Sequence, residues 1–243
     1  MNDLENIFKK SQYLRAQYKF NEAFELVSKA ANQLKLPNDI IWTHQPILWS
    51  NISAGMCQLT RRRKEDAEFI VKIWENKEFV YQFHRHAPPM TMNIDLLRSI
   101  LDKEYFATLS ELNQIHWIIR DKSAKPFGLI SLTNVSLTNR SAEVLVGVLP
   151  ESPLGLATAA MLILFQFFFK SMGFHKLYSF IYEDNPHSLK GTLHLGFVKE
   201  GFLRQHIIDP KTGKFMNLIQ TGILSSEFET QSNIRLMDRL LKS

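Results

Sequence analysis

The chain has 243 residues, of which 45% are hydrophobic and 22% charged, with a formal net charge of +5. This length suffices for one substantial core and a small accessory unit. The single cysteine, Cys57, excludes an internal disulfide, and its apolar neighbours in the sequence favour an inert, buried thiol. The most apolar run, residues 161–169, is far shorter than the roughly 20 residues that cross a bilayer, so we expect a buried helix and no membrane contact.

The charge pattern argues against nucleic acids and metals as partners. The only basic run, residues 61–64, has no interleaved aromatic residues and is typical of a solvated edge. His84 and His86 have no cysteine or carboxylate at ligand spacing beside them, so we expect no metal. The N-terminus shows no apolar segment with a cleavage site, and we therefore expect a cytoplasmic protein.

Residues 1–36 are predicted to form a helical hairpin. Apolar residues recur at helical spacing from Leu4 to Tyr18 and again from Phe20 to Leu34. The second run resembles part of a tetratricopeptide repeat, and one such repeat cannot bury its own apolar face. The hairpin therefore packs on the following domain, or it meets a protein partner or a second copy of the chain. We favour packing, because apolar faces are generally internal.

A connector and a new domain follow the hairpin. Residues 37–55 are dense in turn formers and predict a connector, with Trp42 and Trp49 available as anchors. Residues 56–61 then read as a strand, followed by a helix whose first turn is acidic, as the helix dipole favours. We expect the domain boundary between the connector and this strand.

The middle of the domain reads as strands. Residues 115–121, 126–137 and 140–149 are three short runs separated by turn-rich segments, which suits an antiparallel meander. A short loop containing Gly155 and a long apolar helix closed by Gly173 come next. A strand followed by a loop and a helix leaves a row of free backbone N–H groups at a positive helix end, where a phosphate can bind.

The last part of the chain repeats this order of strand and helix. A strand ends at Asp184, a helix runs from Pro186 to Gly196, and two closing strands lie around residues 197–208 and 215–224. Residues 225–243 form a tail that we expect to be helical.

Residues 56–224 resemble the GNAT superfamily of acyl-CoA N-acyltransferases in this order of elements and in two signatures. The phosphate-loop pattern Q/R-x-x-G-x-G/A falls on residues 152–157, where Gly155 and Ala157 conform and Ser152 does not. The second signature, Asn-x-x-Ser before a helix ending Leu-Gly-Phe, is met at residues 185–197. Among the subgroups, the ribosomal-protein N-terminal acetyltransferases look most similar.

The resemblance implies a fold and a reaction. The fold is α+β, with a mixed, mostly antiparallel, twisted sheet flanked by helices and preceded by the N-terminal hairpin. The reaction is transfer of an acetyl group from acetyl-CoA to a primary amine by direct attack, without metal. The alternative is a catalytically degenerate acyl-CoA-binding or protein-interaction module that uses the hairpin. Two departures from the family pattern favour this alternative: Ser152 in the phosphate loop, and Thr192, where many members carry a tyrosine.

The resemblance also implies which residues contact the cofactor. They are Val148, Ser152, Gly155, Leu156, Ala157, Thr158, Asn185, Ser188 and Lys190. Val148 would act through its backbone N–H group, which could polarise the thioester carbonyl. Lys190 would supply the positive charge that the phosphate loop lacks, although a solvated helix lysine explains it equally well.

Two side chains are candidates for proton transfer. Glu143 alternates with apolar residues on the strand before the phosphate loop, where a carboxylate could take a proton from an ammonium group through water. Thr192 stands where many family members carry a tyrosine that protonates the departing thiolate, so Ser188 is the better candidate acid. An exposed glutamate at the edge of the sheet is the alternative for Glu143.

The acceptor amine is not identified by the sequence. A small molecule, an amino sugar and a protein N-terminus all present the same amine to the same chemistry. Within the variable stretch 81–109, His84, Arg85 and His86 could contact the acceptor, although a surface turn would explain these residues as well.

Overall fold

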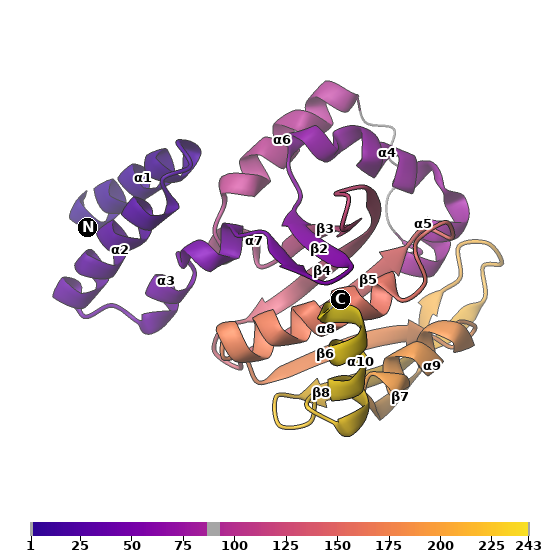
Figure 1. The fold of residues 1–243 in the computed structure, drawn as a ribbon. Coiled ribbons are helices and arrows are strands. Elements are labelled where there is room, and N and C mark those ends of the chain that lie inside the picture. Colours follow the sequence, from indigo (N-terminus) through magenta and orange to yellow (C-terminus); the bar gives the residue numbers. More distant parts are fainter. Residues whose placement is uncertain (1, 87–92, 243) are drawn as a thin grey trace.

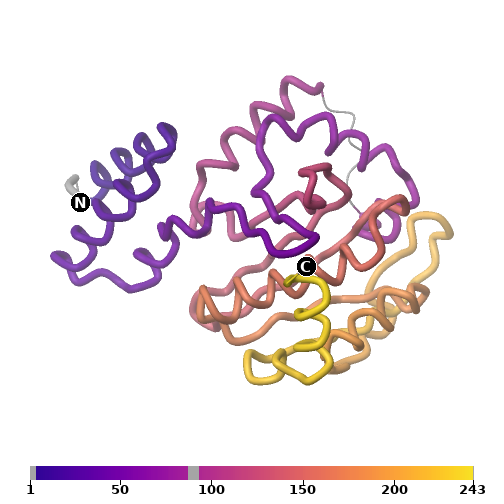
Figure 2. Tube along the Cα trace, viewed as in Figure 1, coloured from indigo at the N-terminus to yellow at the C-terminus, as the bar shows by residue number. Residues whose placement is uncertain are grey.

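The computed structural model describes residues 2–86 and 93–242. It consists of an N-terminal helical hairpin beside a mixed sheet that carries helices on both faces (Figure 1). The tube view shows the same arrangement, with the hairpin at one side of the larger body (Figure 2).

The hairpin is formed by α1 (Asn2–Ala16) and α2 (Phe20–Leu34). Helix α2 ends at Lys35, which adopts the left-handed conformation and bonds back to the last turn. The connector holds α3 (Asn38–Trp42), a 3₁₀ turn η1 (Pro46–Trp49) and a short strand β1 (Ile52–Ala54). The connector thus contributes a strand that its turn-rich composition does not indicate.

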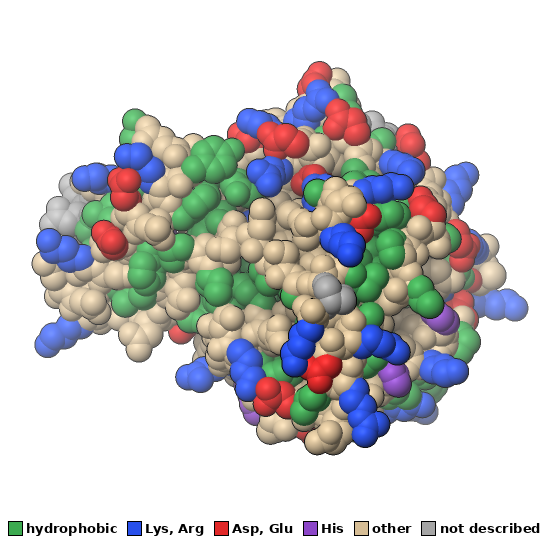
Figure 3. Space-filling view, in the orientation of Figure 1, with side chains coloured by type: hydrophobic (Ala, Val, Ile, Leu, Met, Phe, Trp, Pro, Cys, Tyr) green, Lys and Arg blue, Asp and Glu red, His purple; other side chains and the backbone are tan. Residues whose placement is uncertain are grey.

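The hairpin contacts the sheet domain through polar and aromatic side chains. Arg15 is buried, and its Nε donates a 2.7 Å hydrogen bond to the carbonyl oxygen of Phe106. The ring of Phe20 stacks on Trp49, with ring centroids 5.0 Å apart. Hydrophobic side chains gather where the hairpin meets the larger body (Figure 3). The apolar face of the hairpin is therefore at least partly covered by the domain that follows it.

The sheet of the described residues has the order β1-β2-β3-β4-β5-β6-β8-β7. Neighbours are antiparallel except β5 and β6, which are parallel. The remaining strands are β2 (Cys57–Arg61), β3 (Ile115–Asp121), β4 (Pro126–Ser136), β5 (Ser141–Val148), β6 (Lys176–Tyr182), β7 (Val198–Ile208) and β8 (Phe215–Leu224). This mixed, mostly antiparallel sheet confirms the predicted fold class.

Helices cover both faces of the sheet. One face carries α4 (Ala67–Glu75), after a 3₁₀ turn η2 (Lys64–Asp66), and α6 (Ile94–Phe106). The other carries α8 (Leu156–Phe165) and α10 (Gln231–Leu241). The remaining helices are α5 (Lys77–Phe83), α7 (Leu109–Leu112) and α9 (Pro186–His194). Among the described residues, none of these helices is both long and apolar enough to cross a membrane.

The long apolar helix is the centre of the core. Helix α8 is buried on almost every side, which suits a helix that is hydrophobic all round. At Gln166 it changes to a π-helical segment, η3 (Gln166–Ser171), which still buries three phenylalanines, Phe167 to Phe169. The predicted buried helix is thus present, with a change of helix type at Gln166, the polar residue that interrupts the apolar run 161–169.

The expectation of a solvated basic edge is wrong for the first half of the run 61–64. Arg61 is 5% exposed and donates to the carbonyl groups of Leu48, Glu104 and Ala107. Burial lowers the pKa of Arg61 to about 10. Arg62 pairs with Glu104 at 2.6 Å. Arg61 at the end of β2 and Arg62 directly after it both contact the last turns of α6, and Arg61 also contacts the connector at Leu48.

Candidate active site

The cleft of the molecule lies where β5 and β6 separate. Parallel pairing covers only three residue pairs, from Ser141 with Lys176 to Glu143 with Tyr178. Beyond them β5 stays with β4, and β6 stays with β8. The two strands therefore diverge and leave a cavity of about 190 Å³, to which α5, α8 and α9 also contribute.

Backbone N–H groups on both walls of this cleft lack a strand partner. Leu149 donates to the carbonyl of Phe127 on β4 at 2.7 Å. Because alternate N–H groups of a strand point to opposite sides, those of Val148 and Val146 point away from β4. Val146 lines the cleft, whereas Val148 does not. The same alternation on β6 turns the N–H group of Phe180 toward the cleft. An extended ligand with amide groups can therefore bond to the walls as an added strand would.

The predicted phosphate loop leads into the first turn of α8. Gly155 has φ +88°, a left-handed conformation that favours glycine whether or not a ligand is present. Ala157 and Thr158 lie in the first turn, where N–H groups have no acceptor within the helix. Together with the positive end of the helix dipole, these N–H groups suit a phosphate.

Charged side chains are scarce in this loop. Residues 151–158 include no lysine or arginine. Ser152 is half-buried, and Glu151 pairs with Lys72 of α4 at 3.7 Å. Lys190 is exposed on α9 and, like residues 151–158 themselves, does not line the cavity. The loop itself therefore offers a phosphate dipoles and N–H groups rather than a charged side chain.

The second signature forms the start of α9. The side-chain oxygen of Asn185 accepts a 3.0 Å hydrogen bond from the N–H of Ser188, which caps the helix, and Pro186 occupies the first turn. Asn185, Ser188 and Thr192 all line the cavity. The signature thus has a structural role as a helix cap, and it also brings two hydroxyl groups to the cleft.

Glu143 lies at the point where the strands part. Its carboxylate accepts hydrogen bonds from Asn134 Nδ2 at 2.8 Å and from Thr133 Oγ1 at 3.3 Å, and the residue lines the cavity. Burial raises the pKa of Tyr178, its partner across the parallel pairing, and the charge of Glu143 raises it further. A carboxylate held in place at a cavity wall is suited to proton abstraction.

Arg85 lies inside the wall at one end of the cleft. Its side chain is fully buried and pairs with Asp184. The guanidinium carbon lies 4.0 Å from the ring centroids of both Tyr81 and Tyr182, and the backbone N–H of Arg85 donates to the Tyr182 hydroxyl at 3.1 Å. Any contribution of Arg85 to ligand binding is therefore made through these neighbours.

The two histidines beside Arg85 differ in position. His84 lines the cavity, whereas His86 is exposed, with Nε2 2.7 Å from the carbonyl oxygen of Ile208 on β7. Tyr182 also lines the cavity, and sequence reasoning missed it. Its place at the end of a strand, three residues before the Asn-x-x-Ser signature, is the signal that could have identified it.

Cys57 lies apart from this chemistry. It is fully buried in β2, and burial raises the pKa of its thiol to about 12. A thiol with so high a pKa is a poor nucleophile at neutral pH. The described residues also contain no group of three His, Cys, Asp or Glu side chains that could hold a metal ion.

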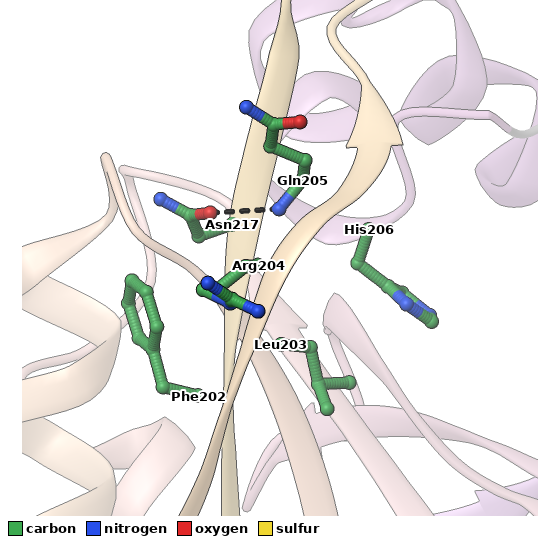
Figure 4. A pocket seen from close by; sticks show the side chains of 6 residues that line it. All are labelled: Phe202, Leu203, Arg204, Gln205, His206 and Asn217. Carbon is green, nitrogen blue, oxygen red and sulfur yellow. Dashed lines mark hydrogen bonds between the residues drawn. The ribbon is translucent and has the colours of Figure 1, made fainter.

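A wider hollow of about 720 Å³ lies along the edge strand β7 (Figure 4). The register of β7 against β8 shifts between Leu203 and Ile207, and the N–H of Gln205 donates to Asn217 Oδ1 at 2.8 Å. None of the residues that line this hollow lines the cleft between β5 and β6. The hollow follows from the bulge at the edge of the sheet.

Comparisons with known proteins agree with this geometry. The family profile described as an acetyltransferase (GNAT) domain matches residues 58–198. The spermidine N(1)-acetyltransferase of Escherichia coli K12 is 26% identical over 156 residues, which are 59% of this chain and 82% of that protein. The Vibrio cholerae spermidine N(1)-acetyltransferase is 25% identical over 138 residues, or 53% of this chain and 79% of that protein.

Solved structures show the same fold. The spermidine N-acetyltransferase from Vibrio cholerae in complex with CoA and spermine superimposes with a TM-score of 0.62 at 21% identity, covering 72% of this chain and 99% of that one. Another structure of the Vibrio cholerae enzyme, described as dodecameric, has a TM-score of 0.59 at 22% identity and covers 73% and 98%.

The family profile covers more than half of the chain and includes the parting strands, Glu143 and the starts of α8 and α9. The chain therefore belongs to the GNAT acetyltransferase family, whose reaction is acetyl-CoA-dependent N-acetylation of an amine.

Proposed function

We propose that this chain acetylates a primary amine of a small molecule in the cleft between β5 and β6. The observation that carries the proposal is the end of parallel pairing after Glu143 and Tyr178. That divergence brings a carboxylate, unpaired backbone N–H groups and the start of α9 to one cavity, and β5 leads on to the start of α8.

The first turn of α8 holds the phosphates of acetyl-CoA in this proposal. Ala157 and Thr158 donate their backbone N–H groups, while Gly155 and Leu156 shape the turn and Ser152 stands at its edge. The pantetheine arm, which carries two amide groups, lies along the open N–H groups of the cleft walls. Asn185 and Ser188 face the arm from the start of α9.

Three groups of the chain perform the transfer. Glu143 takes the proton of the ammonium group through water, so that a neutral amine can attack the thioester carbon. The N–H of Val148 donates to the thioester carbonyl oxygen as negative charge develops there. A C–N bond forms and the C–S bond breaks. Ser188 gives its proton to the departing sulfur and takes up the second proton of the attacking nitrogen through water, so that CoA leaves as the thiol and Glu143 releases the first proton to solvent. No covalent bond to the enzyme is required, which agrees with the inert thiol of Cys57.

A polyamine is the first acceptor to test. The Escherichia coli and Vibrio cholerae relatives at 25–26% identity are spermidine acetyltransferases, and a cavity of about 190 Å³ admits a slender aliphatic amine. His84 and Tyr182 line the end of the cavity formed by α5 and β6. A protein N-terminus is the competing acceptor, because residues 142–148 and 185–197 look like those of the ribosomal-protein subgroup. An amino sugar is the third class.

A CoA-release assay with spermidine, spermine, glucosamine and short peptides tests the acceptor. We expect turnover with a polyamine and its loss in Glu143→Gln. Turnover with peptides alone would indicate that the acceptor is a protein N-terminus. Failure to bind acetyl-CoA in calorimetry would instead favour a degenerate domain that serves protein interaction.

The proposal also concerns the N-terminal hairpin, the oligomeric state and the cellular location of the protein. The contacts of Arg15 and Phe20 support a hairpin that packs on the transferase, even though α2 resembles half of a tetratricopeptide repeat. The dodecameric Vibrio cholerae structure supports a homo-oligomer, which light scattering would test. Consumption of acetyl-CoA supports a cytoplasmic location, where that substrate is supplied.

A further inference from the structure

Helix α10 bridges the two helices that form the proposed acetyl-CoA site. Near its start, Asn233 is fully buried, and its Nδ2 donates to the carbonyl oxygens of Leu195 at 2.9 Å and Phe228 at 2.8 Å. Leu195 follows α9 directly, so the first of these bonds joins the first turn of α10 to the end of α9. Along its length α10 packs against α8.

The last turn of α10 rests on the phosphate loop. The carbonyl oxygen of Leu240 accepts a 3.2 Å hydrogen bond from the N–H of Met56. A Cβ atom placed on Gly155 would lie 3.3 Å from Leu240 Cδ2, and one placed on Gly55 would lie 2.1 Å from Leu240 O. Both glycines thus permit a close approach of α10. Figure 1 shows α10 ending beside the start of α8.

This contact brings cations to a loop that has none of its own. Residues 151–158 contain neither lysine nor arginine, whereas α10 and the residue after it carry Arg235, Arg239 and Lys242. Lys242 pairs with Asp238 at 2.5 Å. Arg239 is exposed, directly precedes Leu240, and has no ion pair among the described residues. Basic side chains are visible around this end of α10 (Figure 3).

We infer that Arg239 binds the phosphates of acetyl-CoA and takes the place of the basic residue that the loop lacks. The inference rests on the proposed function, because it assumes that the phosphates lie at the start of α8. Leu240 fixes the position of the helix end against Gly155, and the long side chain of Arg239 begins one residue away. A guanidinium group can donate two hydrogen bonds to one phosphate.

A purely structural role for Arg239 makes a different prediction. A cation in the last turn of a helix stabilises that helix by interacting with its dipole. Loss of this interaction would lower the melting temperature and would leave the affinity for acetyl-CoA unchanged. Affinity and stability measured together therefore separate the two roles.

The test compares Arg239→Gln with Arg235→Gln, which removes the same charge one helical turn farther from the loop. Calorimetry with acetyl-CoA at low salt should show about fivefold weaker binding for Arg239→Gln, as expected for one partly solvated charge pair. Arg235→Gln should bind almost as tightly as the wild type. The difference should shrink at high salt, because salt screens an exposed pair.

Three results would overturn the inference. If both variants bound acetyl-CoA equally weakly, the effect would come from the overall positive potential of α10 rather than from a direct contact between Arg239 and the phosphates. Unchanged affinity in Arg239→Gln, with or without a lower melting temperature, would assign Arg239 to the helix end alone. Absence of acetyl-CoA binding by the wild type would remove the proposed function and this inference with it. Arg239→Lys should retain part of the affinity, since it keeps the charge and loses the bidentate geometry.

Discussion

Glu143 is the residue on which the proposed reaction depends most. Glu143→Gln keeps the size and one acceptor oxygen of the side chain but cannot accept a proton. We expect its kcat to fall by about a hundredfold, the lower end of the usual contribution of a general base. Its affinity for acetyl-CoA should stay the same. CoA release under saturating acetyl-CoA measures the first quantity, and calorimetry measures the second.

Cys57→Ala is the matched control for this experiment. The thiol is buried and its pKa is raised to about 12, so its removal should leave turnover almost unchanged. The reverse result, with full activity in Glu143→Gln and none in Cys57→Ala, would point to an acyl-enzyme route and contradict the assignment of direct attack.

Glycine at position 155 has two possible physical reasons. The sequence pattern interprets this glycine as room for a phosphate, whereas its φ of +88° already favours glycine on backbone grounds. Gly155→Ala should lower the free energy of unfolding by about 1–2 kcal/mol, because the left-handed conformation is unfavourable for alanine. Urea denaturation without any ligand measures this loss. A variant as stable as the wild type would show that the loop and Leu240 relax, and would leave close approach of a ligand as the reason for glycine.

At the scale of elements, Arg85 joins α5 to β6 and to β8. Beyond Tyr81, Tyr182 and Asp184, its Nη1 lies 3.2 Å from Met216 Sδ of β8. Arg85→Met should raise the KM for the acceptor, because the cavity wall formed by α5 loses its anchor. The KM for acetyl-CoA should change little, since the start of α8 contributes none of these contacts.

Steady-state kinetics with both substrates varied tests the role of Arg85. Arg85→Lys is the informative companion, because lysine keeps the charge but cannot stack between two rings as a planar guanidinium does. Equal rises in both KM values would mean that the whole domain has loosened, and would contradict a local role.

Local periodicity predicted most of the helices and strands. It did not predict the features that depend on contacts between distant parts of the sequence. The strands at 115–121 and 215–224 are present at the predicted bounds, because alternation and turn residues mark them within a few positions. Helix α10 was expected only as a helical tail. Its contact with Gly155 joins segments about 85 residues apart, which no local pattern can indicate.

The site shows the same division. The motif predicted Asn185 and Ser188, and strand alternation predicted Glu143, and all three line the cavity. The predicted contacts at Val148, in residues 152–158 and at Lys190 do not line it. The interior position of Arg85 was not predicted, since it depends on Tyr182 and Asp184 from another strand. Charge in a sequence does not reveal whether the folded chain supplies its own counter-ion.

At the scale of the whole molecule, the hairpin should contribute to stability. Removal of residues 1–36 exposes Trp49 and takes away the hydrogen bond of Arg15 to the carbonyl of Phe106 and its ion pair with Glu111. We expect a lower melting temperature with acetyl-CoA binding retained, because burial of each large side chain contributes roughly 1.5–3 kcal/mol. Scanning fluorimetry with and without acetyl-CoA measures both. An unchanged melting temperature together with the loss of a protein partner would favour an interaction module.

The stability of the molecule should also depend on pH through His116. Burial lowers the pKa of His116 well below its ordinary value of 6.5, and the charges of Arg62 and Arg61 lower it further. Its Nδ1 lies 2.7 Å from Ser131 Oγ. Because the folded-state pKa is lowered, the unfolded chain takes up this proton first. Stability is therefore retained above pH 6.5 and decreases as the pH falls below it, by at most about 1.4 kcal/mol per pH unit.

His116→Asn keeps a group that can hydrogen bond to Ser131 but removes the titration. Urea denaturation of both proteins between pH 7 and pH 5 should show a shallower loss of stability for the variant. Parallel curves would assign the acid sensitivity to other groups.

The crossed order of the sheet has a consequence for how the protein emerges from the ribosome. Strand β6 is made before β7 and β8, yet its long antiparallel partner is β8, and its pairing with β5 covers only three residue pairs. Until residues 215–224 have left the exit tunnel, β6, which forms one wall of the cleft, can pair only with β5. The contacts of Met56 and Gly155 form later still, because their partner is Leu240. A nascent chain stalled before β8 would therefore have synthesised every residue of both cofactor signatures without a finished cleft to present them.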